Sequence, residues 1–234
     1  MAEIADAFAT AWRLIASGDA ALLEIVSLSL RVTAAALVLA ALIGLPLGAF
    51  LGVARFPGRR VLVALLSTGM ALPPVVVGLG LYLVFSREGP LGAYELLFTP
   101  SAMVIAQALL VMPIVASLTR QTIEDMAREY DEQLRAFGAS RLRAAATLLV
   151  EARYSLPTAL LAGLGRAIAE VGAVMIVGGN IAHVTRTMTT AIVLHSSRGD
   201  TPLALALGMI LVALAALVNG ATEGLREVAR RAGA

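Results

Sequence analysis

The sequence predicts an all-α membrane protein with about five transmembrane helices, with its N-terminus outside and its C-terminus inside. Hydrophobic residues make up 59% of the 234-residue chain and charged residues only 15%, whereas about 25% of an ordinary soluble domain is charged. Several uncharged runs reach the ~20 residues that a membrane-crossing helix needs. The arginines are also distributed unevenly between the connections. This composition argues against a soluble enzyme and against a nucleic-acid-binding protein.

The first 24 residues are expected to form an interfacial segment. They carry four acidic residues and Arg13, and no short apolar core precedes a cleavage site as in a signal peptide. As a helix, this segment would place Phe8, Trp12 and Ile15 on one side.

A transmembrane domain is expected over residues 25–225, followed by a cytoplasmic tail at 226–234. Four windows contain no charged residue: Val32–Ala54, Val61–Ser86, Leu96–Thr119 and Thr201–Thr222. A fifth window, Tyr154–Ala182, is interrupted only by Arg166 and Glu170. Soluble helices of this length would show a polar face, so the chain is expected in the cell (inner) membrane.

The arginines orient the five predicted spans. All 18 basic residues are arginine, and twelve of them fall on one side of the membrane. These twelve are Arg55, Arg59, Arg60, Arg120, Arg128, Arg135, Arg141, Arg143, Arg153, Arg226, Arg230 and Arg231. The other side holds only Arg13, Arg87, Arg186 and Arg198. The positive-inside rule places the twelve in the cytoplasm.

One long polar segment, residues 120–153, separates the third and fourth spans. Apolar residues recur in it at steps of three and four, which predicts one helical face: Ile123, Met126, Tyr130, Leu134 and Phe137. Gly138 is the expected helix stop, and Ser140 the N-cap of a second helix beginning at Arg141. Such a helix pair can occupy a partner's groove. The alternative is a solvated loop that folds back on the bundle.

Residues 132–138, Glu-Gln-Leu-Arg-Ala-Phe-Gly, resemble the cytoplasmic motif of ABC importer permeases, which is Glu-Ala-Ala, three residues, then Gly. Glu132 and Gly138 match, whereas Gln133 and Leu134 replace the two alanines. The resemblance implies a type I permease bundle and a segment that couples it to an ATPase. The coupling residues would be Glu132, Arg135, Phe137, Gly138, Ala139, Ser140 and Arg141.

Residues 163–180 and 185–192 are similar to the molybdate, tungstate and sulfate branch of these permeases, and most like its tungstate-type members. The resemblance implies a homodimer that imports a tetrahedral oxyanion. Tungstate is the first expectation, and molybdate and sulfate are the alternatives. It also implies a cytoplasmic ATPase dimer and an extracytoplasmic oxyanion-binding protein as partners, with alternating access as the mechanism.

Arg166 and Glu170 are four residues apart, which predicts one helical face for both. A charge at membrane depth is costly and normally faces protein or water. One interpretation is a structural ion pair that holds the bundle. The other is that Arg166 adds positive potential to an anion pathway while Glu170 holds it in place.

Gly178 and Gly179 follow the fourth span, where two glycines leave the backbone free to turn. Asn180, Thr185, Arg186 and Thr187 would then face an arriving oxyanion or the docked binding protein. The alternative is a loop that only leaves the membrane. Elsewhere, Gly44, Gly48 and Gly52 permit close approach of another helix, from this chain or from a second copy.

No catalytic residue, cofactor or metal site is expected. The chain has no cysteine, two histidines and no lysine, and therefore no Gly-x-x-x-x-Gly-Lys-Ser/Thr nucleotide motif. ATP hydrolysis would thus belong to a partner. An intramembrane enzyme would need a nucleophile and base at membrane depth. An ion-coupled secondary transporter often shows inverted repeats, which are not visible here, so it is the less favoured alternative.

Overall fold

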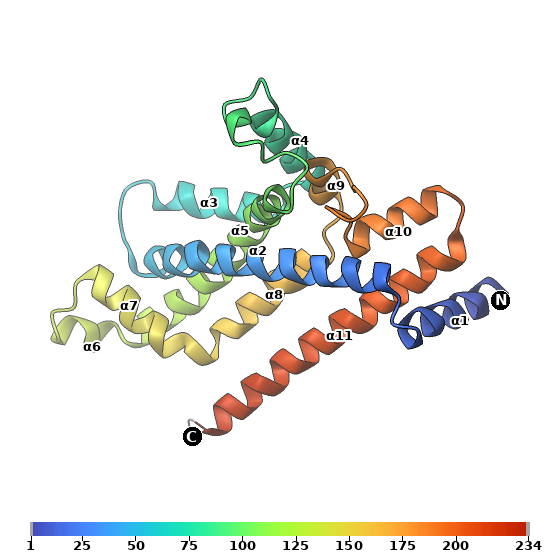
Figure 1. Cartoon of the computed structure of the whole chain (residues 1–234). Coiled ribbons are helices and arrows are strands. Elements are labelled where there is room, and N and C mark those ends of the chain that lie inside the picture. Colours follow the sequence, from blue (N-terminus) through green and yellow to red (C-terminus); the bar gives the residue numbers. More distant parts are fainter. Residues whose placement is uncertain (1, 233–234) are drawn as a thin grey trace. The chain divides into compact units, whose positions relative to one another are not determined.

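The computed structural model describes residues 2–232, and over that range it is helical, with no strand (Figure 1). The helices are α1 (Ala2–Ala16), α2 (Ala20–Val53), α3 (Arg59–Met70), α4 (Pro74–Phe85), α5 (Pro100–Glu129), α6 (Asp131–Ala136), α7 (Arg141–Glu151), α8 (Leu156–Ile168), α9 (Gly172–Gly178), α10 (Met188–Ser197) and α11 (Thr201–Ala232). Two 3-10 turns, η1 (Gly92–Tyr94) and η2 (Ala152–Tyr154), lie in the connections.

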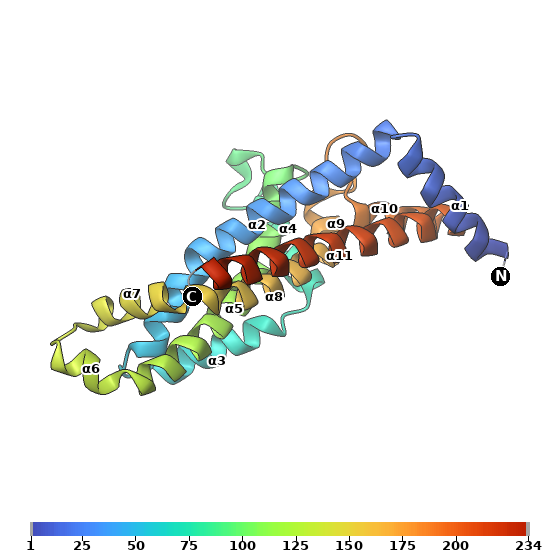
Figure 2. The same cartoon turned by 90° about the horizontal axis from the view of Figure 1, so that it is seen from below.

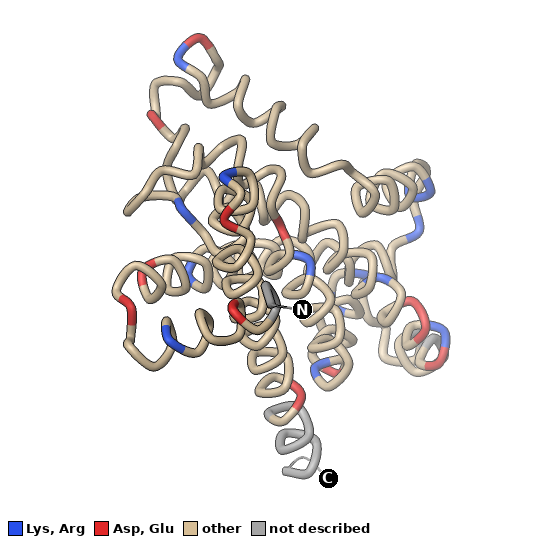
Figure 3. The backbone as a smooth tube through the Cα atoms, turned by 90° about the vertical axis from the view of Figure 1, so that its right-hand side faces the viewer, with Lys and Arg blue, Asp and Glu red and all other residues tan. Residues whose placement is uncertain are grey.

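Within the described part of the chain, three helices are long and apolar enough to cross a membrane: α2, α5 and the Thr201–Gly224 part of α11. Two further pairs qualify together but are bent at a short break, α3 with α4 by 102° and α8 with α9 by 58°. Counting each pair once gives up to five spans, and they match the five windows of the sequence. Figure 3 shows that charged residues fall mainly on connections and helix ends. The predicted all-α membrane class is confirmed.

The chain divides into two compact units, each built from three stretches of sequence. Unit 1 comprises Met1–Ala35, Pro73–Gln107 and Ile168–Ala221. Unit 2 comprises Ala36–Leu72, Ala108–Ala167 and Thr222–Ala234. The long helices α2, α5 and α11 each contribute to both units.

Unit 2 is organised around a close contact between α2 and α5. A Cβ on Gly44 would come within 3.1 Å of Val115, one on Gly48 within 2.5 Å of the Ala116 carbonyl oxygen, and one on Gly52 within 2.8 Å of Ile123. The glycine repeat therefore packs against a helix of the same chain, which decides between the two alternatives left by the sequence. At Gly48 only glycine permits this approach, because a Cβ would meet the α5 backbone, whereas at Gly44 and Gly52 it would first meet the side chains of Val115 and Ile123.

Unit 1 packs α4 on α9, and joins the beginning of α2 to α10 and α11 (Figures 1 and 2). A Cβ on Gly78 of α4 would lie 2.9 Å from the Ala173 Cα of α9. A buried apolar cluster links three helices through Leu22, Met188, Ala191 and Leu207. Helix α10 corrects the sequence interpretation, which expected only a loop between the fourth and fifth spans.

Helix α1 has the amphipathic character that the sequence predicts. Its Phe8, Trp12 and Ile15 side chains are exposed, whereas Ala7 and Ala11 are buried. The large apolar side chains thus share an uncovered face, as expected of a helix that lies at a membrane interface.

The Gly48 contact predicts that Gly48→Ala lowers the stability of the protein. The new Cβ would meet the α5 backbone, and overpacking of this kind costs about 1–3 kcal/mol. Gly208→Ala in α11 is the matched control, because nothing lies within 4 Å of a Cβ there and alanine favours a helix. Thermal unfolding of the purified protein in detergent measures both. Equal melting temperatures for the two variants would contradict the contact.

Candidate functional site

The first candidate site is the segment around Gly138, in unit 2. Helix α5 ends at Glu129, the helix is interrupted at Tyr130, and α6 and α7 follow as a helix pair (Figures 1 and 2). Gly138 has a φ of 60°, and the Ala139 N–H donates to the Leu134 carbonyl oxygen at 3.0 Å. This hydrogen bond and the left-handed glycine form a Schellman-type helix end.

The predicted second helix also begins where the sequence places it. Helix α7 starts at Arg141, and the Ser140 side chain accepts a hydrogen bond from the Arg143 backbone N–H at 3.4 Å. This satisfies one of the donors that a helix N-terminus leaves free. Both the glycine turn and the serine cap of the sequence analysis are confirmed.

The predicted apolar face of this segment is only partly correct. Ile123 is buried, and Met126, Tyr130 and Leu134 pack against the cluster around it. Phe137, by contrast, is 87% exposed. The helical period ends early because α5 stops at Glu129 and α6 at Ala136. Phe137 therefore lies in the turn with its ring uncovered, and Leu142 and Val150 of α7 are exposed as well.

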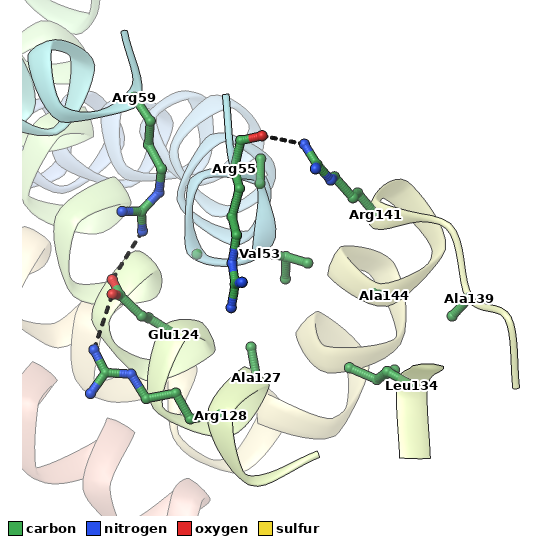
Figure 4. Close-up of a pocket in the computed structure, with 12 residues that line it drawn as sticks. Val53, Arg55, Arg59, Glu124, Ala127, Arg128, Leu134, Ala139, Arg141 and Ala144 are labelled. Carbon is green, nitrogen blue, oxygen red and sulfur yellow. Dashed lines mark hydrogen bonds and ion pairs between the residues drawn. The ribbon is translucent and has the colours of Figure 1, made fainter. Parts of the chain in front are cut away.

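An ion-pair cluster centred on Glu124 stabilises the polar end of α5. The Glu124 carboxylate accepts from Arg59 at 3.1 Å, Arg120 at 2.5 Å and Arg128 at 3.2 Å. Figure 4 shows the Arg59 and Arg128 members. Glu124 was not among the predicted site residues, although Arg120 and Arg128 stand four residues before and after it, the spacing that permits ion pairs on a helix. The ion pair with Arg59 could not be predicted from spacing, because Arg59 is 65 residues away in the sequence.

The second candidate site is the break between α8 and α9 and the loop that follows α9, in unit 1 from Ile168 onward. The interpretation that Arg166 and Glu170 share one helical face is wrong, because α8 ends at Ile168. Arg166 lies in the last turn of α8, whereas Glu170 lies in the break, 2% exposed. Their spacing therefore does not correspond to an α-helical pair.

The Glu170 carboxylate caps α9. Its Oε1 accepts a hydrogen bond from the Ala173 backbone N–H at 2.9 Å, in the first turn of that helix. Its carbonyl oxygen accepts from the Thr189 hydroxyl of α10, also at 2.9 Å. A carboxylate at a helix N-terminus satisfies an orphan donor and interacts favourably with the helix dipole. Glu170 thus joins α9 to α10.

Side chains of the loop after α9 hold its own backbone. The buried Thr185 hydroxyl donates to the Gly178 carbonyl oxygen and accepts from the Ile181 N–H at 3.0 Å. Arg186, half-buried, donates to the side-chain and main-chain oxygens of Asn180, each at 3.3 Å. Gly179 and Asn180 both have positive φ. The loop is thus an ordered turn that presents Arg186 at its surface.

Thr187 begins α10 with a reciprocal capping arrangement. Its side chain accepts from the backbone of Thr190, and the Thr190 hydroxyl accepts from the Thr187 N–H at 3.0 Å. Thr190 was not among the predicted site residues; it takes the N3 position that Glu or Gln holds in the usual capping box. Thr185 and Thr187 are therefore structural within this loop, since their buried hydroxyls serve its backbone.

Apolar spans, two of them broken, together with an exposed polar helix pair are the features of a multi-pass membrane protein, and broken helices are common where such proteins form a transport pathway. The family described as binding-protein-dependent transport system inner membrane component matches residues 44–227, and the chain belongs to this family. It is thus an inner-membrane permease subunit of an ABC importer.

The curated relatives are transport permeases as well. The chain is 43% identical over 211 residues to a probable anion ABC transporter permease protein of Haloferax volcanii, covering 88% of this chain and 91% of the relative. It is 39% identical to the tungstate uptake system permease protein TupB of Peptoclostridium acidaminophilum, covering 97% and 100%. The corresponding TupB of Campylobacter jejuni is 38% identical, covering 74% and 72%.

The capping contact predicts different effects for two substitutions of Glu170. Glu170→Gln keeps an oxygen that can accept from the Ala173 N–H, whereas Glu170→Ala removes it and should cost about 1–2 kcal/mol, the usual cost of losing a side-chain capping hydrogen bond. The melting temperature in detergent should fall further for the alanine variant than for the glutamine variant, which loses only the charge. An equal loss in both variants would instead assign the stabilising role to the charge.

Proposed function

We propose that this permease imports a tetrahedral oxyanion, most specifically tungstate, by alternating access. Two copies form the pathway, a separate ATPase dimer drives it, and an extracytoplasmic binding protein delivers the anion. The observation that carries the proposal is the similarity to a tungstate uptake permease over 97% of this chain and the full length of that relative. Molybdate and sulfate share the shape and charge of tungstate and remain the alternatives.

The ATPase docks on the coupling segment, formed by Glu132, Arg135, Phe137, Gly138, Ala139, Ser140 and Arg141. The exposed Phe137 ring supports this role, because large uncovered apolar side chains mark interaction surfaces. The twelve arginines on this side favour a cytoplasmic location for the segment and the C-terminus, with the N-terminus outside.

The pathway or gate is formed by Arg166, Glu170, Gly178, Gly179, Asn180, Thr185, Arg186 and Thr187. Among these, Arg186 presents a guanidinium that is braced by Asn180, and such a group suits an oxyanion. Glu170, Thr185 and Thr187 hold the break and the loop in shape. Conduction requires weak binding, so substrate selection belongs to the binding protein.

Uptake into proteoliposomes that contain the permease, its ATPase and the binding protein tests this function. Radiolabelled tungstate should accumulate only with ATP and all three components, and unlabelled tungstate should compete better than sulfate. The permease alone should hydrolyse no ATP. Uptake that persists without the ATPase and collapses with an uncoupler would favour an ion-coupled transporter, and stronger competition by sulfate would reassign the anion.

The glycine turn predicts a defect in coupling for Gly138→Val. A β-branched residue tolerates positive φ poorly, and the left-handed conformation costs about 1–2 kcal/mol, or roughly tenfold in the population of the correct turn. Transport should fall by about that factor while the yield in the membrane stays unchanged.

Gly138→Asn is the matched control, because asparagine visits the left-handed region and nothing lies within 4 Å of a Cβ at this position. This variant should transport close to the parent rate. Normal transport by the valine variant would show that the turn does not couple the permease to its ATPase.

A further inference from the structure

A cavity of about 510 Å³ lies beside the coupling segment, in unit 2, with more positive than negative charge in its lining. Arg55, Arg59, Arg128 and Arg141 line it, and Glu124 is the carboxylate among the described lining residues. Four arginines against one glutamate leave a surplus of three positive charges. Arg59 and Arg128 share Glu124, whereas Arg55 and Arg141 have no carboxylate partner among the described residues.

Two of these guanidinium groups, those of Arg59 and Arg141, are held in position by the backbone. Arg59 Nε donates to the Leu51 carbonyl oxygen at 2.8 Å, and Arg141 donates to the Arg55 carbonyl oxygen. Figure 4 shows the Arg55 side chain extending toward Ala127, into the space that these residues line. Cations fixed before a ligand arrives lower the ordering cost of binding it.

The lining combines these cations with apolar wall. Val53, Ala127 and Leu134 stand among the arginines. The volume falls within the range of about 300–1,000 Å³ that is usual for small-molecule sites. A planar guanidinium matches a tetrahedral oxyanion through two parallel hydrogen bonds. This surplus of positive charge therefore fits a phosphate group better than a metal cation or a neutral ligand, and the apolar wall leaves room for an organic part on that phosphate.

We propose that this cavity binds a phosphate-type tetrahedral oxyanion, with Arg55 and Arg141 as its ligands and the Glu124 cluster as its support. The anion is the phosphate of an anionic lipid headgroup or a free phosphate, which share this chemistry. The described lining residues, which run from Gly52 to Ala144, include none of the candidate pathway residues.

Binding to the full-length permease, without ATP or partners, tests the proposal independently of transport. Inorganic phosphate is titrated calorimetrically into the detergent-solubilised protein. Native mass spectrometry then compares the retention of phosphatidylglycerol with that of phosphatidylcholine. Arg55→Gln should weaken binding by roughly tenfold, the usual effect of one charge-assisted hydrogen bond. Arg60→Gln, an exposed neighbour outside the lining, is the matched control and should bind like the parent.

Loss of phosphatidylglycerol alone in Arg55→Gln identifies a lipid headgroup, and loss of inorganic phosphate alone identifies a free anion; either supports the site. If Arg55→Gln lowers the melting temperature, the same binding measurements use Arg141→Gln instead, with Arg143→Gln as its control. Equal binding by parent, lining variant and control overturns the proposal.

Discussion

Each helix break in this apolar chain has to satisfy its own backbone hydrogen-bonding groups, because hydrocarbon offers no water to replace them. Between α3 and α4, Ala71 and Leu72 donate back to the carbonyls of the preceding turn, and Pro73 and Pro74 have no N–H to satisfy. Between α8 and α9 the solution uses side chains: Glu170 accepts from one N–H, and Thr189 donates to the Glu170 carbonyl. Polar residues inside candidate spans therefore act first as partners of the backbone.

This constraint explains which parts of the architecture the sequence predicts. The structure contains the five apolar windows, the turn at Gly138 and the cap at Ser140. Each of these features depends only on residues that are close together in the sequence. The break after Ile168 depends on hydrogen-bond partners elsewhere in the chain. The four-residue spacing of Arg166 and Glu170 therefore predicted one continuous helix where the structure has a break. Helix α10 is different, because Thr187 and Thr190 cap it locally. Only its contact with α2, in which the Met188 N–H donates to the Ser29 hydroxyl, has no local pattern.

The glycine repeat of α2 likewise predicts a helix contact without identifying the partner helix. A period of four identifies a face that admits close approach, but it does not identify the approaching helix. In unit 2 that helix is α5, whose Val115, Ala116 and Ile123 occupy the positions a side chain would take. The candidate coupling segment continues directly from α5, through Tyr130 into α6. The close contact between α2 and α5 therefore lies next to this segment. Such a contact suits the segment to transmit a displacement, because close-packed helices shift as units.

The arginines link orientation to local structure. A helix C-terminus leaves its last four carbonyls without intrahelical partners and carries partial negative charge. At the end of α2, Arg59 donates to the Leu51 carbonyl and Arg141 to that of Arg55, just beyond the helix. Arginine suits this task better than lysine, since its fork binds two acceptors at once and its charge is permanent. Arginines that the positive-inside rule assigns to one side of the membrane thus also link α7 to the connection between α2 and α3. The same groups line the adjacent cavity, so its surplus of charge follows from how this end of unit 2 is held together.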